Sequence, residues 1–231
     1  MSAVGVGFDI DHTLAIDNKL ERVAFLRLLE RIIIDGGAPL GNLAQETEAI
    51  DALLAYQRSG ECTLDVAVEK FAAERGIGST AAYPQVYRRM TLEMAPSFVV
   101  ADPQAEGLLE ELQRRGIAVA VLSNGWNPLQ TLKARRAGYT GTVLASADLG
   151  VQKPHARAFA ALAAALGQPA QRCFYVGDDP KGDIMGAMHA GFNAVWLDNE
   201  GRTYPADLPA PSHTIQTLDA LLDVIGEAVA S

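Results

Sequence analysis

Apolar and polar positions follow two different patterns along the chain, and the change between them divides the sequence into two parts. Between residues 16 and 95 the apolar residues recur at intervals of three and four, the spacing of amphipathic helices. This pattern predicts four helices, over residues 19–35, 44–56, 63–75 and 82–93. Glycines separate these helices, and Asp17 or Asn18 is expected to cap the first. No convincing strand pattern occurs in this segment, which is therefore predicted to be all-helical.

Short apolar segments outside that block have the length and composition of buried strands. They lie at residues 4–8, 117–122, 142–146, 172–176 and 194–197, with helical patterns at residues 103–115, 128–137, 155–166, 182–190 and 218–228. Strands that alternate with helices favour a parallel sheet with right-handed crossovers. The first strand can join this sheet only if the helical block loops out. We therefore predict an α/β core from residues 1–15 and 96–231, with a helical cap domain inserted over residues 16–95.

The composition limits the classes of partner. With 49% apolar and 20% charged residues, the 231-residue chain has the composition of a globular protein. Its formal charge of −9 argues against a general affinity for nucleic acid or anionic membranes. The sequence contains no apolar run near the roughly 18 residues that span a bilayer and no signal-peptide pattern. Cys62 and Cys173 are expected to be free thiols. A cytoplasmic protein without nucleic-acid or membrane partners is expected, and the oligomeric state is left open.

Two carboxylates directly follow the first predicted strand. Asp9 and Asp11 are two residues apart, and in extended chain residues i and i+2 lie on the same side. Two negative charges so close repel each other in a partly desolvated site, so they need a cation or a shared proton. This pair therefore indicates a metal site or an acid–base site.

Three further polar clusters follow other predicted strands or lie in the adjoining loops. They are Ser-Asn-Gly at residues 123–125, Lys153, and Asp178 with Asp183. Each alone has an ordinary explanation, as a turn, a solvated lysine or a helix cap. In open parallel sheets, however, ligands bind outside the carboxyl ends of the strands. The occurrence of all these clusters in order along an α/β pattern favours a functional site.

These segments carry a family resemblance. The chain resembles the haloacid dehalogenase-like (HAD) hydrolase superfamily, in the phosphatase branch with a helical cap inserted after the first motif. The matching motifs are F-D-I-D-H-T-L at residues 8–14, L-S-N-G at 122–125, K-P at 153–154 and G-D-D-P-K-G-D at 177–183. The match covers residues 4–15 and about 96–200, whereas the cap matches in position and helicity only. The resemblance implies a Rossmann-like three-layer core with a central parallel sheet.

The resemblance also implies a magnesium-dependent phosphatase that forms an aspartyl phosphate. Asp9 would be the nucleophile and Asp11 the general acid and base. Family dehalogenases attack carbon and lack an acid two residues after the nucleophile, so Asp11 favours phosphate-ester chemistry. The expected Mg²⁺ ligands are a carboxylate oxygen of Asp9, the main-chain carbonyl of Asp11, and Asp178. The choice of Asp178 over Asp183 as direct ligand follows from the resemblance alone.

The remaining motif residues are assigned to the phosphoryl group of the substrate. Ser123 and the main-chain amides of Asn124 and Gly125 would bind its oxygens. Lys153 would add a positive charge to the same group and steady Asp9. Asp183 would orient Lys153 or a metal-bound water.

The substrate is expected to be a small phosphorylated metabolite, and two alternatives stay open. One is a phosphotransferase of the mutase type, which the absence of histidine from residues 16–95 disfavours. The other is a non-enzymatic regulatory homologue, against which the intact acidic and lysine motifs argue. The cap contains several cations that could meet an anionic leaving group: Lys19, Arg22, Arg58, Lys70, Arg88 and Arg89.

Overall fold

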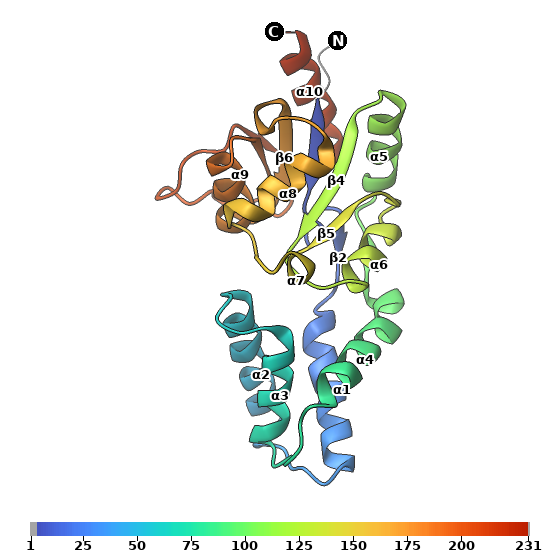
Figure 1. The fold of residues 1–231 in the computed structure, drawn as a ribbon, viewed down its shortest axis with the longest axis vertical. Coiled ribbons are helices and arrows are strands. Elements are labelled where there is room, and N and C mark those ends of the chain that lie inside the picture. Colours follow the sequence, from blue (N-terminus) through green and yellow to red (C-terminus); the bar gives the residue numbers. More distant parts are fainter. Residues whose placement is uncertain (1–3, 231) are drawn as a thin grey trace. The chain divides into compact units, whose positions relative to one another are not determined.

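The computed structural model describes residues 4–230, and the chain divides into two compact units (Figure 1). A core unit comprises the residues up to Asp17 and those from Val99 onward, and a cap unit comprises Asn18–Phe98. The divisions therefore lie two to three residues beyond those expected from the sequence. The chain leaves and re-enters the core through two short strands, β2 (Ala15–Ile16) and β3 (Val100–Ala101), which pair antiparallel. Strands of two residues have no readable periodicity, so the sequence pattern missed them.

The core contains a six-stranded sheet in the order β5-β4-β1-β6-β7-β8. Every neighbouring pair in this sheet is parallel, which confirms the predicted α/β fold. The first strand lies in the middle, as an inserted cap requires. The strands are β1 (Gly5–Phe8), β4 (Ala118–Ser123), β5 (Val143–Ala145), β6 (Cys173–Gly177), β7 (Asn193–Leu197) and β8 (His213–Ile215). The last of these follows a Pro-rich loop and was not predicted, because its three residues are too few to show a strand pattern.

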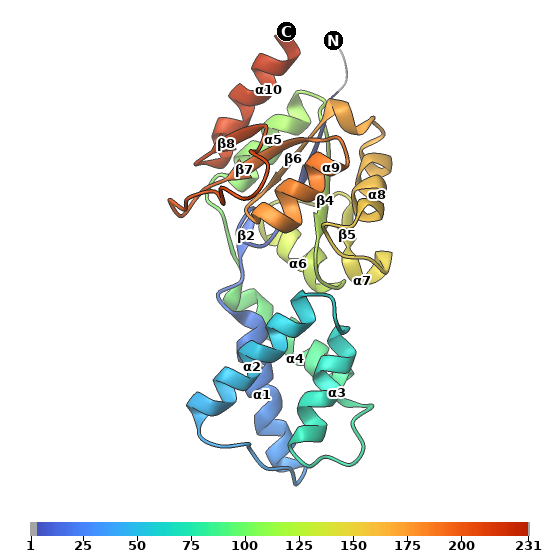
Figure 2. The same cartoon turned by 90° about the vertical axis from the view of Figure 1, so that its left-hand side faces the viewer.

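Helices cover both faces of the sheet and complete three layers (Figure 2). They are α5 (Ala105–Arg114), α6 (Leu129–Arg136), α7 (Ser146–Leu149), α8 (Ala156–Leu166), α9 (Gly186–His189) and α10 (Leu221–Ala230). Short helical turns occur at Ala170–Arg172, at Leu218–Ala220 and, in π conformation, at Pro180–Met185. Helix α8 packs on β1, β4 and α9, whereas α5 packs on β4 and the turn before α10. Within residues 4–230, no helix combines the length and hydropathy that a membrane span requires.

Glycine at position 7 allows α8 to lie close against β1. A Cβ atom at Gly7 would lie 2.5 Å from Leu162 Cδ2 and 2.9 Å from Tyr175 Cδ2, well inside van der Waals contact. All four residues of β1 are buried, and Leu162 and Tyr175 are fully buried as well. The absence of a Cβ atom at Gly7 therefore lets Leu162 and Tyr175 pack closely against the strand that leads into Asp9.

The cap consists of four helices, α1 (Leu20–Ile34), α2 (Leu43–Arg58), α3 (Leu64–Glu74) and α4 (Tyr83–Phe98). Phe25 packs against the rings of Phe71 and Tyr87, at centroid distances of 5.0 and 4.6 Å. A fully buried ion pair joins Arg75 to Glu46. Helix α4 extends beyond its expected end and includes Pro96 in its last turn, where the missing N–H removes one main-chain hydrogen bond of the helix.

The start of α1 corrects one prediction from the sequence. Lys19, with a left-handed φ of 64°, occupies the N-cap position, so capping by Asp17 or Asn18 was wrong. Asn18 instead donates its side-chain amide to the carbonyl of Phe98, 2.7 Å away, at the other end of the cap unit. Asp17 belongs to the core and accepts a hydrogen bond from Lys133.

We predict that Gly7→Ala destabilises the core, because the added methyl group meets Leu162 and Tyr175 in a closely packed layer. Overpacking of this kind costs about 1–3 kcal/mol. Gly107→Ala is the matched control, since Gly107 is exposed in α5 and an added Cβ meets no atom within 4 Å. Alanine at that helical position should gain up to about 1 kcal/mol. Urea unfolding midpoints measure both effects, and equal midpoints for the two variants would contradict this account of β1.

Candidate active site

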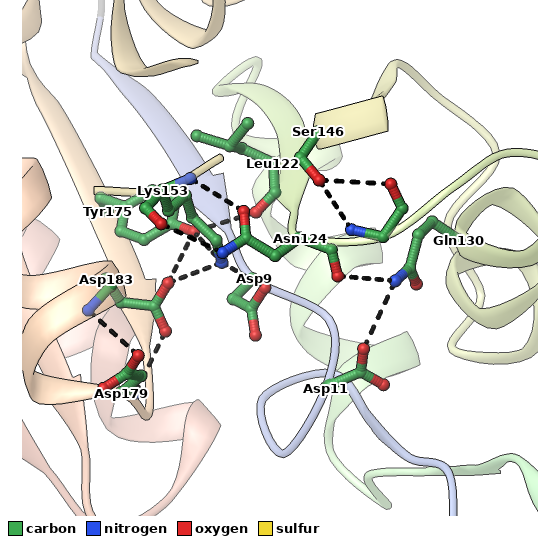
Figure 3. A network of polar contacts seen from close by, with 12 residues as sticks. Asp9, Asp11, Leu122, Asn124, Gln130, Ser146, Lys153, Tyr175, Asp179 and Asp183 are labelled. Atoms are coloured by element: carbon green, nitrogen blue, oxygen red, sulfur yellow. Dashed lines mark hydrogen bonds and ion pairs between the residues drawn. The ribbon is translucent and has the colours of Figure 1, made fainter. Parts of the chain in front are cut away.

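Polar side chains from four segments meet at the carboxyl ends of β1, β4 and β6 (Figure 3). Asp9 directly follows β1, and its main-chain N–H donates to Val176 O of β6 at 2.9 Å. Ser123 is the last residue of β4, and Asp178 directly follows β6. The parallel arrangement thus brings together residues that are more than a hundred positions apart in sequence.

Lys153 is the centre of the densest hydrogen-bond network. Its Nζ donates to Asp9 Oδ1 at 2.5 Å, to Asp183 Oδ1 at 2.6 Å and to the Tyr175 hydroxyl at 3.1 Å. The lysine side chain is 4% exposed, so it reaches these acceptors inside the protein. Asn124 holds its main chain, because the Asn124 side-chain amide exchanges two hydrogen bonds with the N–H and C=O of Lys153. The lysine is therefore fixed to the Ser-Asn-Gly turn.

The carboxylates of Asp9, Asp178 and Asp183 form a cluster in which one oxygen from each lies within 4.8 Å of the others. Asp183 has both oxygens engaged, since Oδ1 accepts from Lys153 and Oδ2 accepts from the Asp179 N–H at 3.1 Å. Asp178 is contacted at Oδ2 by Arg202 Nη2 at 3.3 Å. Of the three carboxylates, Asp183 is the one most firmly bound to protein groups.

The electrostatics of the cluster show an excess of negative charge. Burial raises the pKa of Asp9 to about 8, against the opposing effect of Lys153 and with a further upward contribution from Asp183. Burial also raises the pKa of Asp178 to about 6, assisted by Asp183 and opposed by Arg202. For Lys153, burial favours the neutral form, but Asp183 and Asp9 outweigh it and hold its pKa well above the usual value. The lysine therefore stays cationic, and the carboxylates still need further positive charge.

This charge balance and the donor set fit a divalent cation. Carboxylate oxygens are hard ligands that suit Mg²⁺ better than Zn²⁺. A cation bound among the three carboxylates would favour the ionised forms of Asp9 and Asp178, against the burial and the carboxylate repulsion that raise their pKa values. The main-chain carbonyl of Asp11 as a further ligand stays a prediction.

The Asp11 side chain does not join that cluster but faces α6. Lys133 Nζ donates to Asp11 Oδ1 at 2.6 Å, and Gln130 Nε2 lies 3.5 Å from Asp11 Oδ2. Lys133 and Gln130 are each only 2% exposed. Sequence reasoning missed both, and the available signal was a lysine and a glutamine on the buried side of an otherwise ordinary amphipathic helix.

In the turn at residues 123–125, one of the main-chain amides expected to bind the phosphoryl group already has a partner within the protein. The Gly125 N–H donates to Ser146 Oγ at 3.0 Å, so in this structure the amide is already bound within the protein. A Cβ atom at Gly125 would lie 2.0 Å from Gln130 Nε2, so a larger residue would displace the end of the Gln130 side chain. Ser123 is buried next to this turn, at 1% exposure. The assignment of the Gly125 amide to the phosphoryl group therefore requires loss of its bond to Ser146.

Tyr175 is a third residue that the sequence did not indicate. Its ring packs in the core layer, while its hydroxyl lies 3.2 Å from Asp183 Oδ1 and 3.0 Å from Leu122 O. From sequence, a tyrosine within an apolar strand is interpreted as an ordinary core residue. No sequence signal distinguishes it from a tyrosine whose hydroxyl reaches a functional site. The hydroxyl supports the Lys153 network from the floor of the site.

Most cations proposed in the cap are paired within the cap. Arg89 is exposed, whereas Lys19 occupies the N-cap of α1. The other four form the pairs Arg22–Asp51, Arg58–Glu21, Lys70–Glu74 and Arg88–Asp65, with N···O distances of 2.6, 2.8, 4.0 and 2.6 Å. Their charges are thus largely offset by neighbouring acids of the same unit.

Residues 5–191 match the family model of the haloacid dehalogenase-like hydrolases. The chain belongs to this family. The match confirms the resemblance found in the motifs, and it runs from β1 through the cap to α9.

Individual HAD relatives include enzymes of two kinds. The chain is 41% identical to a phosphoserine phosphatase of Thermus thermophilus over 99 residues, which are 42% of this chain and 40% of that enzyme. It is 28% identical to haloacetate dehalogenase H-2 of a Moraxella species over 126 residues, 53% of this chain and 56% of that enzyme. The alignments thus span about half the length of these relatives. The magnesium-bound structure of the HAD-hydrolase YfnB from Bacillus subtilis has the same fold, with a TM-score of 0.71, 24% identity and 97% and 99% coverage of the two chains.

We predict that divalent cations stabilise the protein most at alkaline pH. The pKa of Asp9 is raised on folding, so below pH 4 the group is protonated in both states and carries no penalty. As pH rises towards about 8 the unfolded chain releases a proton that the folded site retains, and stability is lost. With chelator, the melting temperature should therefore fall over this range, and Mg²⁺ should restore it.

The variant Asp9→Asn tests this linkage in thermal unfolding scans at several pH values. In chelator, the difference between the melting temperatures of Asp9→Asn and wild type should grow as pH rises. The expected gain is about 2–4 °C for each kcal/mol of penalty removed. Asp223→Asn, at an exposed position on α10, is the control and should follow wild type. A wild-type melting temperature that is insensitive to Mg²⁺ at every pH would contradict the proposed cation site.

Proposed function

We propose that the protein is a magnesium-dependent phosphatase that hydrolyses a small phosphorylated metabolite through phosphorylated Asp9. One observation carries the proposal: a buried carboxylate fixed by a lysine at 2.5 Å is followed, two residues later, by a second carboxylate held apart from it. A nucleophile alone would serve a dehalogenase as well as a phosphatase. The second acid serves chemistry in which a leaving oxygen must be protonated, as in phosphate esters.

The core residues would carry out two displacement steps. Asp9 attacks phosphorus and the bond to the leaving oxygen breaks, while Asp11 gives that oxygen a proton. Water then attacks phosphorus, the bond to Asp9 breaks, and Asp11 takes a proton from the water. Lys153 occupies one oxygen of Asp9, fixes the direction of the other and offsets charge on the phosphoryl group.

Asp9, Asp178 and the Asp11 carbonyl would hold Mg²⁺, which offsets the repulsion between an anionic nucleophile and an anionic substrate. Asp178 is the better direct ligand because both oxygens of Asp183 are already bound within the protein. Asp183 then acts on Lys153 rather than on the cation. Ser123, with the turn that follows it, would bind the phosphoryl oxygens.

We predict that purified protein releases phosphate from p-nitrophenyl phosphate with Mg²⁺, and that chelation abolishes this turnover. Asp9→Asn should reduce activity to background, because no nucleophile remains. Asp11→Asn should lower kcat/KM for phenyl phosphate, whose leaving group needs a proton, by about 10²–10⁴-fold, the usual contribution of general acid–base catalysis. The exposed variant Asp223→Asn, purified in parallel, is the control for contaminating phosphatases and for loss of a carboxylate.

Two results would contradict the proposal. One is full activity of Asp9→Asn, and the other is release of chloride from L-2-chloropropionate without Mg²⁺ in place of phosphate release. A panel of phosphorylated metabolites, scored by free phosphate, then identifies the substrate class. Isomerised sugar phosphate among the products would instead indicate phosphotransfer of the mutase type.

A further inference from the structure

Lys133 is a buried cation outside the carboxylate cluster at Asp9. Its side chain is 3% exposed, and its Nζ lies 2.6 Å from Asp11 Oδ1 and 3.0 Å from Asp17 Oδ2. Both carboxylates are more accessible than the lysine, at 30% and 18% exposure. The ammonium group therefore reaches outward from α6 and bridges two acids of the segment that follows β1.

Gln130 contacts the same carboxylate from one turn earlier on α6. Residues i and i+3 of a helix share a face, so Gln130 and Lys133 both point towards Asp11. Gln130 Nε2 also lies 3.2 Å from the Asn124 carbonyl, next to the turn after β4 (Figure 3). At 3.5 Å its contact with Asp11 is at the limit of a hydrogen bond, whereas the 2.6 Å contact of Lys133 is a short charge-assisted one. Lys133 is the principal partner of Asp11.

We propose that Lys133 is a positioning residue that fixes the Asp11 carboxylate for proton transfer to the leaving oxygen. This inference rests on the proposed phosphatase function. Asp11 lies in the irregular segment between β1 and β2, where no strand ladder fixes its side chain. Asp17 accepts a second hydrogen bond from the Lys133 ammonium group, which helps to fix that group beside Asp11. Lys133 contacts the Asp11 carboxylate directly, so its effect on the reaction would be exerted through that acid.

A purely structural role explains this arrangement poorly. A lysine buried against carboxylates loses hydration, and an apolar side chain of similar volume often serves stability as well or better. The same kind of contact occurs twice at the site. A buried lysine, Lys153, binds Asp9, and a second buried lysine, Lys133, binds Asp11. Each acid of the D-x-D pair therefore has its own buried lysine, and the two carboxylates are kept in separate places.

The test compares two probes that differ in their need for proton donation. Phenolate, whose conjugate acid resembles tyrosine with a pKa near 10, leaves more easily when protonated. The nitro group makes p-nitrophenolate a good leaving group without that help. The ratio of kcat/KM for phenyl phosphate to that for p-nitrophenyl phosphate thus reports the efficiency of Asp11. The fraction of active protein cancels from the ratio, so partial misfolding of a variant does not alter it.

Lys133→Met should lower kcat/KM for phenyl phosphate by about 10²-fold, the effect of displacing a reacting group by about 1 Å. The value for p-nitrophenyl phosphate should fall far less, so that the ratio falls roughly tenfold or more. Lys133→Arg keeps a cation and should restore most of the ratio. Asp17→Asn leaves Lys133 and Asp11 in place and should shift the ratio in the same direction by a smaller factor. Arg135→Met removes an exposed cation from the same helix and should leave the ratio unchanged.

An unchanged ratio in Lys133→Met, or an equal change in Arg135→Met, would overturn the inference. If Lys133→Met cannot be purified, the ratio in Asp17→Asn decides, and a wild-type value there would overturn it too. Failure of the phosphatase proposal is seen separately, because the wild-type protein would then cleave neither probe with Mg²⁺.

Discussion

The site depends on one buried ammonium group, that of Lys153, placed between the carboxylates of Asp9 and Asp183. A lone charge in this position would be strongly disfavoured, and each carboxylate would tend to keep a proton. Together they form a network that is stable only while its geometry is kept. The hydrogen bonds from the Asn124 side chain to the Lys153 main chain and the hydroxyl of Tyr175 serve that geometry, and they join the turn after β4, the loop before α8 and the interior of β6. The parallel sheet brings the segments that carry this network together.

The negative charge left over by that network determines what else the site can hold. Asp9 and Asp178 both have raised pKa values because burial and neighbouring carboxylates are only partly offset by Lys153 and Arg202. An anionic substrate would add to this excess, and a divalent cation among these carboxylates would offset it. The charge balance of the described residues therefore supports the proposed magnesium dependence independently of the family to which the chain belongs.

Much of this arrangement could be predicted from the sequence, and the missing parts have identifiable causes. Periodicity gave the helices of the cap and the α/β alternation, because buried helices and strands impose regular patterns. The strand ends marked Asp9 and Asp178, because polar residues after apolar strands are conspicuous, and Lys153 was expected in an adjoining loop. Lys133 and Tyr175 could not be found in this way, since they lie inside a helix and a strand and their polar atoms reach the site across the fold. Sequence patterns locate groups at the ends of elements better than groups within them.

The separation of Asp9 from Asp11 is the feature that gives the two acids different chemistry. Adjacent carboxylates two residues apart would share a proton and titrate as a pair if nothing held them apart. Lys153 draws one towards β6 and Lys133 draws the other towards α6, so each acid interacts with its own cation. In the proposed reaction, the buried Asp9 carboxylate would serve as the nucleophile, whereas the more accessible Asp11 carboxylate would exchange protons with a leaving group and with water. Two lysines from different segments thus give the two acids of one motif different surroundings.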